Sequence, residues 1–165
     1  MNHVPIKRVP TLILKAVIVV TGALVLVLCA LLFPQIYLSL QGASPELAPV
    51  ATLAMIAFFL TPIPFFFGLY QGMKLLHSID QNNAFSESSV IALKRIQYGA
   101  GAMSLLYAAC MPFVFVFAEI DDAPGTILIG SAVVLAPVIV ATFAGVLQKL
   151  FRNAIDMKLE NEFTI

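Results

Sequence analysis

Charged residues are scarce in this sequence, and tryptophan is absent. Only 11% of the 165 residues are Asp, Glu, Lys or Arg, whereas 61% are hydrophobic. A soluble domain has about 25% charged residues, so these polar side chains could not cover a globule of this size in water. The shortage argues against a soluble domain and a disordered chain. A net charge of zero argues against a nucleic-acid binder held by bulk positive charge. We therefore expect an integral membrane protein.

Catalytic and metal-binding motifs are also lacking. Cys29 and Cys110 lie in apolar runs without a CxxC or Cys/His pattern, so we expect both to pack as small hydrophobic side chains. No Walker loop, dinucleotide fingerprint, HExxH or GxSxG motif occurs. No ionisable residue lies in the middle of a long apolar run, which argues against a proton-coupled transporter. We predict no enzyme activity, no catalytic residue, no metal site and no cofactor.

Four apolar stretches are long enough to cross a membrane. A helix needs about 20 apolar residues to span a hydrocarbon core of about 30 Å. The stretches cover about residues 12–33, 47–70, 98–118 and 125–147. Residues 16–33 and 127–146 are apolar on every face and do not alternate, which favours helices over the strands of a barrel. The predicted fold is an all-α membrane protein, with four transmembrane helices in a single domain of residues 1–165.

Basic residues fall on only one side of this four-span arrangement. The nine Lys and Arg residues lie at or before the start of the first span, between the second and third, and after the fourth. The other two connections contain only acidic charges, at Glu46, Glu119, Asp121 and Asp122. An excess of Lys and Arg marks the cytoplasmic side. We therefore predict that the N-terminus, the C-terminus and residues 71–97 and 148–165 are cytoplasmic.

Turn and capping signals occur between the second and third spans. Residues 80–83 (DQNN) break the helix that leaves the second span. Ser86 is then placed to cap a new helix by accepting a bond from a free backbone N–H. Phe85 and Val90 stand at the positions of a hydrophobic staple. We expect a short helix–turn–helix connection at the membrane surface, which is either a docking surface for a cytoplasmic partner or only a well-capped connector.

The tail after the fourth span has a similar character. Apolar residues from Leu147 to Met157 recur at helical spacing, so the fourth span is predicted to continue as an amphipathic helix. Residues 159–165 (LENEFTI) alternate between apolar and polar. This alternation suits a short strand or a segment folded against the central turn, and a frayed end is the third interpretation.

Proline and small residues leave two interpretations open inside the spans. Pro62 and Pro64 must kink or unwind the second span. Such a break either shapes helix packing or creates a ligand site. Ala100, Ser104 and Ala108 form a stripe of small residues on the third span, which suits close packing within the chain or a homodimer.

The central turn and the C-terminus resemble a known family. Residues 83–96 (NAFSESSVIALKRI) are similar to a pattern of Pro-Phe-Ser/Thr, then Asn-Val, then Leu, two basic residues and Ile. The ending LENEFTI is similar to an acidic stretch that closes in Leu-Thr-Val/Ile. Both are typical of the bacterial four-span proteins of the domain of unknown function 2975 family, although Ala84, Ser89 and Phe163 depart from the usual residues. The resemblance implies a multi-pass protein of the bacterial inner membrane, in a family without an established activity.

Members of this family are often encoded beside small helix-turn-helix regulators, so the resemblance implies a regulatory or sensory membrane partner. We predict that the cytoplasmic face docks such a regulator without direct contact to nucleic acid. The residues expected to form this surface are Phe85, Ser86, Val90, Leu93, Lys94, Arg95, Ile96, Phe163 and Ile165. The alternative is a small transporter or export accessory subunit, with Pro62, Pro64 and Tyr70 beside the substrate path. A homo-oligomer in the lipid bilayer stays open in both cases.

Overall fold

The computed structural model describes residues 9–41, 48–81, 83–120 and 122–162, and all regular structure within these ranges is helical. Four of its helical stretches, with 26 to 37 residues each, are long and apolar enough to cross a membrane. The prediction of an all-α protein with four membrane-spanning helices is therefore confirmed. The helices are α1 (Val9–Gln41), α2 (Ala48–Leu60), α3 (Pro62–Asp80), α4 (Glu87–Ile120) and α5 (Gly125–Glu162).

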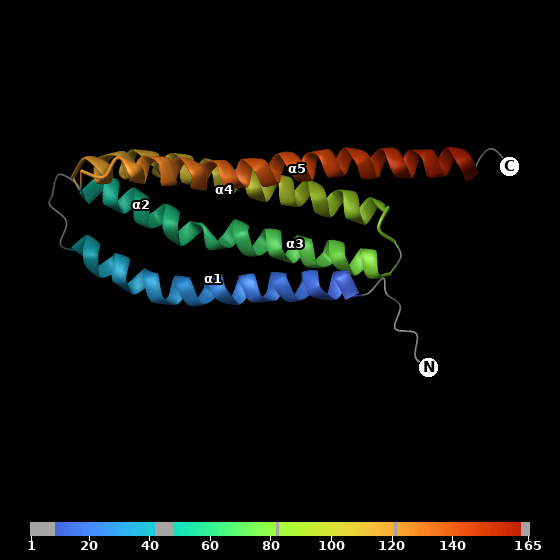
Figure 1. The fold of residues 1–165 in the computed structure, drawn as a ribbon, viewed down its shortest axis with the longest axis horizontal. Coiled ribbons are helices and arrows are strands. Elements are labelled where there is room, and N and C mark those ends of the chain that lie inside the picture. The colour runs from blue at the N-terminus through green and yellow to red at the C-terminus, as the bar shows by residue number, and fades with distance from the viewer. Residues whose placement is uncertain (1–8, 42–47, 82, 121, 163–165) are drawn as a thin grey trace.

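The helices pack in a row that follows their order in the chain. Helix α1 packs on α2 and α3, these two pack on α4, and α4 packs on α5 along most of its length (Figure 1). Within the described ranges, α5 makes extensive contact with α4 alone. Large hydrophobic side chains on all five helices stay exposed in the single chain. Such surfaces are expected where lipid covers the helices.

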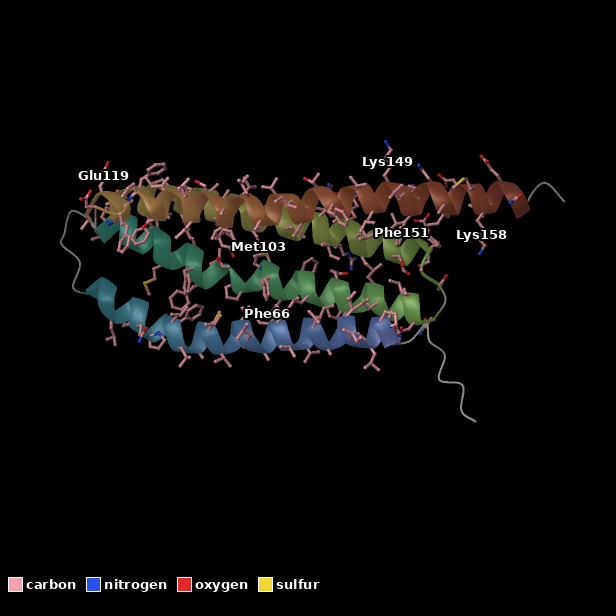
Figure 2. The ribbon with its side chains drawn as sticks, viewed as in Figure 1. Phe66, Met103, Glu119, Lys149, Phe151 and Lys158 are labelled. Atoms are coloured by element: carbon pink, nitrogen blue, oxygen red, sulfur yellow. The ribbon has the colours of Figure 1, made fainter. Side chains whose placement is uncertain are left out.

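Basic side chains of the described ranges are confined to one end of this row. The start of α1, the turn from α3 to α4 and the end of α5 lie towards the same end (Figure 1), which we call the basic end. Glu119 and Asp122 lie at the opposite, acidic end, and Figure 2 shows Glu119 there. The Lys and Arg residues of the described ranges all lie towards the basic end: Lys15, Lys74, Lys94, Arg95, Lys149, Arg152 and Lys158.

The second span consists of two helices because two prolines interrupt it. Pro62 and Pro64 have no backbone N–H to donate to a carbonyl oxygen one turn earlier, and α2 ends at Leu60. The backbone N–H and the hydroxyl of Thr61 both donate to the carbonyl oxygen of Ala57, at 3.0 and 2.9 Å. Pro62 then begins α3 at a position where no helical N–H bond is needed. Thr61 keeps helical backbone angles, with φ −54° and ψ −42°, so the prolines divide the span into two helices without unwinding the backbone at this residue.

Two contacts fix the position of α1 along the axes of α2 and α3. Lys15 near the start of α1 forms an ion pair with Asp80 at the end of α3. At the other end, the ring of Phe33 packs on Phe58 of α2, with ring centroids 5.1 Å apart. Helix α1 is therefore antiparallel to α2 and α3 over the whole distance between these two contacts.

The α1 contacts place residues 15–33 of α1 beside residues 58–80. Helix α3 continues without a break from Pro62 to Asp80 and packs against α1 and α4. The sequence expected a helix to leave the second span and end near residue 80, and residues 71–80 are the last turns of α3. The helical stretch Met55–Asp80 is apolar enough to cross a membrane.

Candidate functional site

Side chains larger than alanine are buried mainly near the basic end, where α3 meets α4. Leu76 of α3 and Val90 and Leu93 of α4 are at most 4% exposed, and the polar side chains of Gln71 and Ser89 are 1% and 0% exposed. This part of the row is a protein core and not a lipid-facing surface. Val90 and Leu93 were expected to contact a partner. The structure corrects this expectation, because both side chains are used to pack α4 against its neighbours.

The turn from α3 to α4 is capped as its sequence indicates. Helix α3 ends at Asp80, and Ser86 directly precedes Glu87, the first residue of α4. The carbonyl oxygen of Ser86 accepts backbone bonds from Ser89 and Val90, at 3.0 and 3.2 Å. Its hydroxyl oxygen accepts a further bond from the Ser89 N–H at 3.4 Å. Ser86 is therefore the N-cap of α4, and its role is to shape the turn.

Phe85 connects this turn to the tail of the protein. Its side chain is 57% exposed, and its ring packs on Phe151 of α5 with centroids 5.1 Å apart and an angle of 59° between the rings. Val90, the other residue of the expected staple, is buried. The two segments singled out in the sequence thus touch through a pair of aromatic rings.

Helix α5 continues past the α3–α4 turn (Figure 1). Phe151 lies at the height of the turn, and α5 ends at Glu162. The eleven residues 152–162 therefore form an overhang of about 16 Å at 1.5 Å per residue. Since residues 159–162 are helical, the strand interpretation of the tail is wrong for them. Phe163 and Ile165, two of the expected docking residues, lie outside the described residues.

Lys94 and Arg95 are exposed, and Ile96 is half-buried. The ammonium group of Lys94 lies 5.9 Å from the centroid of the Tyr98 ring, a cation–π distance. The side chain of Gln97 lies against Gly145 of α5. Helices α4 and α5 are antiparallel. Lys94, one helical turn before Gln97, therefore lies at the same height as Lys149, one helical turn after Gly145.

A second polar region lies where α2 and α3 meet, far from the basic end. The Tyr107 hydroxyl of α4 lies near the side chain of Thr61, the residue between the two helices. Tyr107 also lines a mostly apolar cavity of about 260 Å³ between α4 and α5. Tyr70 is exposed and does not line this cavity. Within the described ranges, no group of three or more His, Cys, Asp or Glu side chains is placed to hold a metal ion.

Comparisons with known proteins agree with the resemblance in the sequence. The family described as "Protein of unknown function (DUF2975)" matches residues 35–165, which include α2 to α5. "Uncharacterized membrane protein YoaS" of Bacillus subtilis (strain 168) is 46% identical over 159 residues, which cover 96% of this chain and 99% of that relative. No solved structure matches the chain. With four helices able to span a membrane, the chain is a multi-pass membrane protein and belongs to the DUF2975 family, whose function is unknown.

Proposed function

We propose that this protein is a non-enzymatic membrane regulator that docks a small cytoplasmic protein, such as a helix-turn-helix regulator, at its basic end. The observation that supports this function is the contact between Phe85 and Phe151. It joins the α3–α4 turn and the tail of α5 into one surface outside the apolar spans. A turn that only connects two helices needs a helix cap and no contact with the tail. A surface built from two segments can, in addition, recognise a folded partner.

We call the proposed docking surface the ledge. It consists of Phe85 in the turn and of Phe151 and Leu159 on α5, which extends past the turn. Phe151 and Leu159 are two helical turns apart on the same side of α5, which is the side that contacts Phe85. Phe85 and Leu159 are exposed, and Phe151 is half-buried. An amphipathic helix of a partner would place its apolar face against this ledge, as in other helix-in-groove complexes.

The proposed orientation places the basic end in the cytoplasm of a bacterial cell, with the protein in the inner membrane. The described Lys and Arg residues all lie towards this end, and such an excess marks the cytoplasmic side. Lys94 and the exposed ring of Tyr98 form a cation–aromatic pair suited to the level of the lipid headgroups. Lys94 and Arg95 would then border the docking surface on its membrane side.

A non-enzymatic role fits the state of the polar side chains near the ledge. Gln71 and Ser89 are buried, so a substrate in the cytoplasm could not reach them. The hydroxyl of Ser86 is engaged in capping α4. The family to which the chain belongs has no known catalytic activity.

One observation favours the alternative of a small transporter or export accessory subunit. Pro62 and Pro64 cannot donate to the carbonyl oxygens one turn earlier, and Thr61 and Tyr107 lie close together beside this interruption. Broken helices of this kind bind substrates in known transporters. Flux of a solute into proteoliposomes, abolished by Tyr107→Phe and retained in Tyr70→Phe, would establish this function in place of docking.

Affinity purification after cross-linking in native membranes tests the docking function. We expect the wild-type protein to recover a specific cytoplasmic protein, and Phe85→Ala combined with Arg95→Ala to recover at least tenfold less of it. The matched control is Phe117→Ala, because Phe117 is an exposed ring at the acidic end that stacks on Phe113. Equal recovery by both variants, or recovery of no cytoplasmic protein by the wild type, would reject the proposal.

A further inference from the structure

A regular apolar pattern lies on the side of α5 that faces away from α4. The pattern repeats at alternating steps of three and four residues over three heptads, the spacing of the a and d positions in coiled coils. We call this set the outer seam. All seven of its side chains are exposed: Ala136, Ile139, Phe143, Val146, Leu150, Asn153 and Met157.

The remaining helices of the chain leave the outer seam uncovered. The residues of α5 that contact α4, among them Gly130, Val134 and Gly145, lie on the other side of the helix. Ala144 is buried and Phe151 packs on Phe85, and both belong to this inner side. In the described ranges, α4 is the single helix with which α5 makes extensive contact.

Lipid accounts for only part of the outer seam. Its first four residues lie before Lys149 and Arg152, at the depth where acyl chains cover apolar side chains. Met157 lies eight residues past Lys149, which corresponds to about 12 Å along the helix. Its side chain is 63% exposed. The seam therefore continues beyond the lipid along the overhang of α5, where water would otherwise surround it.

We propose that the outer seam packs against the outer seam of a second copy of this chain, as a parallel pair of α5 helices about a two-fold axis normal to the membrane. A helix with the same heptad repeat interdigitates along the full length of the seam, and a second copy has that repeat by definition. Two copies inserted in the same orientation necessarily present parallel α5 helices. The seam extends over three heptads, from Ala136 to Met157.

Asn153 supports the parallel arrangement. It is the one polar residue among the seven, and it occupies a d position in the overhang. In a parallel pair the two Asn153 side chains meet at the same height and can hydrogen-bond with each other. The flanking charges do not oppose the pair, because Lys149 faces Ala154 of the second copy and Asp156 faces its Asn161 in this register.

The dimer is independent of the proposed docking function. The outer seam and the ledge lie on opposite sides of the overhang, so one copy can use both surfaces at once. Phe85→Ala removes a ring from the ledge and leaves the seam unchanged. This variant should lose the docked partner and still dimerise, so the failure of one proposal is distinguishable from the failure of the other.

Disulfide cross-linking in native membranes tests the dimer. Both natural cysteines are first replaced by alanine, and single cysteines are then introduced as Asn153→Cys, Met157→Cys or Arg152→Cys. We expect oxidation with copper phenanthroline to form dimers of the first two at least tenfold faster than of Arg152→Cys. Arg152 is the matched control, because it is exposed at the same height on another side of α5. Equal rates for the three variants, or no dimer with any of them, would overturn the proposal.

A second measurement avoids the engineered cysteines. Native mass spectrometry of the protein in nanodiscs should give a dimer for the wild type and for Arg152→Glu, and a monomer for Met157→Glu. Helix content by circular dichroism should be the same for all three, because both substitutions lie on exposed positions. A wild-type monomer, or a dimer that tolerates Met157→Glu, would contradict the outer seam as the interface.

Discussion

The ammonium group of Lys15 pairs with the carboxylate of Asp80, which joins the start of α1 to the last residue of α3. The two side chains are 30% and 24% exposed, so water screens their attraction only in part. This ion pair lies at the basic end of the antiparallel contact of α1 with α2 and α3. The contact between Phe33 and Phe58 lies at the other end. The height of α1 in the membrane is therefore tied to that of α3.

Removal of this ion pair should weaken the packing of α1. Lys15→Gln is expected to cost about 1 kcal/mol of unfolding free energy, near the upper limit for partly exposed pairs. Thermal unfolding in a mild detergent measures the change. Lys74→Gln is the control, because Lys74 is an exposed lysine of α3 and its replacement should change the stability by less than about 0.5 kcal/mol. Equal losses for the two variants would show that the pair contributes nothing specific.

Three glycines in the spans should respond differently to alanine. A Cβ added to Gly130 would lie 2.9 Å from Cγ1 of Val114, a stiff branched side chain, whereas a Cβ on Gly145 would meet the flexible amide of Gln97. Gly130→Ala is therefore expected to cost about 1–3 kcal/mol, and Gly145→Ala to cost less. Gly68 has open space around it, so Gly68→Ala should stabilise α3 by up to about 1 kcal/mol. Melting temperatures in one detergent rank the three, and a different order would contradict the α4–α5 packing.

Features that depend on neighbouring residues could be predicted from the sequence. The break at Pro62 follows from a missing N–H, and the cap at Ser86 follows from a hydroxyl placed before a helical run. The four spans follow from length and hydropathy in the same way. Each of these signals lies within a few residues of the structure that it predicts.

Features that depend on distant residues could not be predicted in this way. Phe85 contacts Phe151, which follows 66 residues later, and no local spacing indicates this contact. Val90 and Leu93 have the spacing of an amphipathic helix whether a partner protein or α3 covers them, so the pattern cannot tell a docking face from a core. The run of alternating apolar and polar residues after Leu159 is too short to predict a strand, and α5 continues as a helix to Glu162.

The hydrogen bond between α4 and α5 provides a test of their packing inside the membrane. The Ser104 hydroxyl donates to the carbonyl oxygen of Val134 at 3.1 Å. Ser104→Ala should cost about 0.6 kcal/mol, the average for such bonds between membrane helices. Thr142→Val should cost less, because the Thr142 hydroxyl donates to Val138 within its own helix. Unfolding in a detergent series measures both, and a larger loss for Thr142→Val would argue against the α4–α5 contact at Ser104.

The proposed orientation predicts opposite labelling of two glutamates on α4. Glu87 and Glu119 are both exposed, at the basic and the acidic end respectively. In a chain without its natural cysteines, a membrane-impermeant maleimide should label Glu119→Cys in intact cells. It should label Glu87→Cys only after permeabilisation, because the basic end is expected to face the cytoplasm. The reverse pattern would place the proposed docking surface outside the cell.

The contact between Phe85 and Phe151 should hold the base of the overhang against the turn. An aromatic pair contributes about 0.5–1.5 kcal/mol beyond the burial of its area, which corresponds to a few-fold change in the population of an open tail. Trypsin cleavage after Arg152, in vesicles that expose the basic end, should therefore accelerate a few-fold in Phe85→Ala and in Phe151→Ala. The double variant should be cleaved about as fast as the faster single variant, because either substitution already removes the pair.

Phe117→Ala is again the control and should leave the rate of cleavage unchanged. Additive acceleration in the double variant would mean that the two rings act separately, and the ledge would then lose its structural basis.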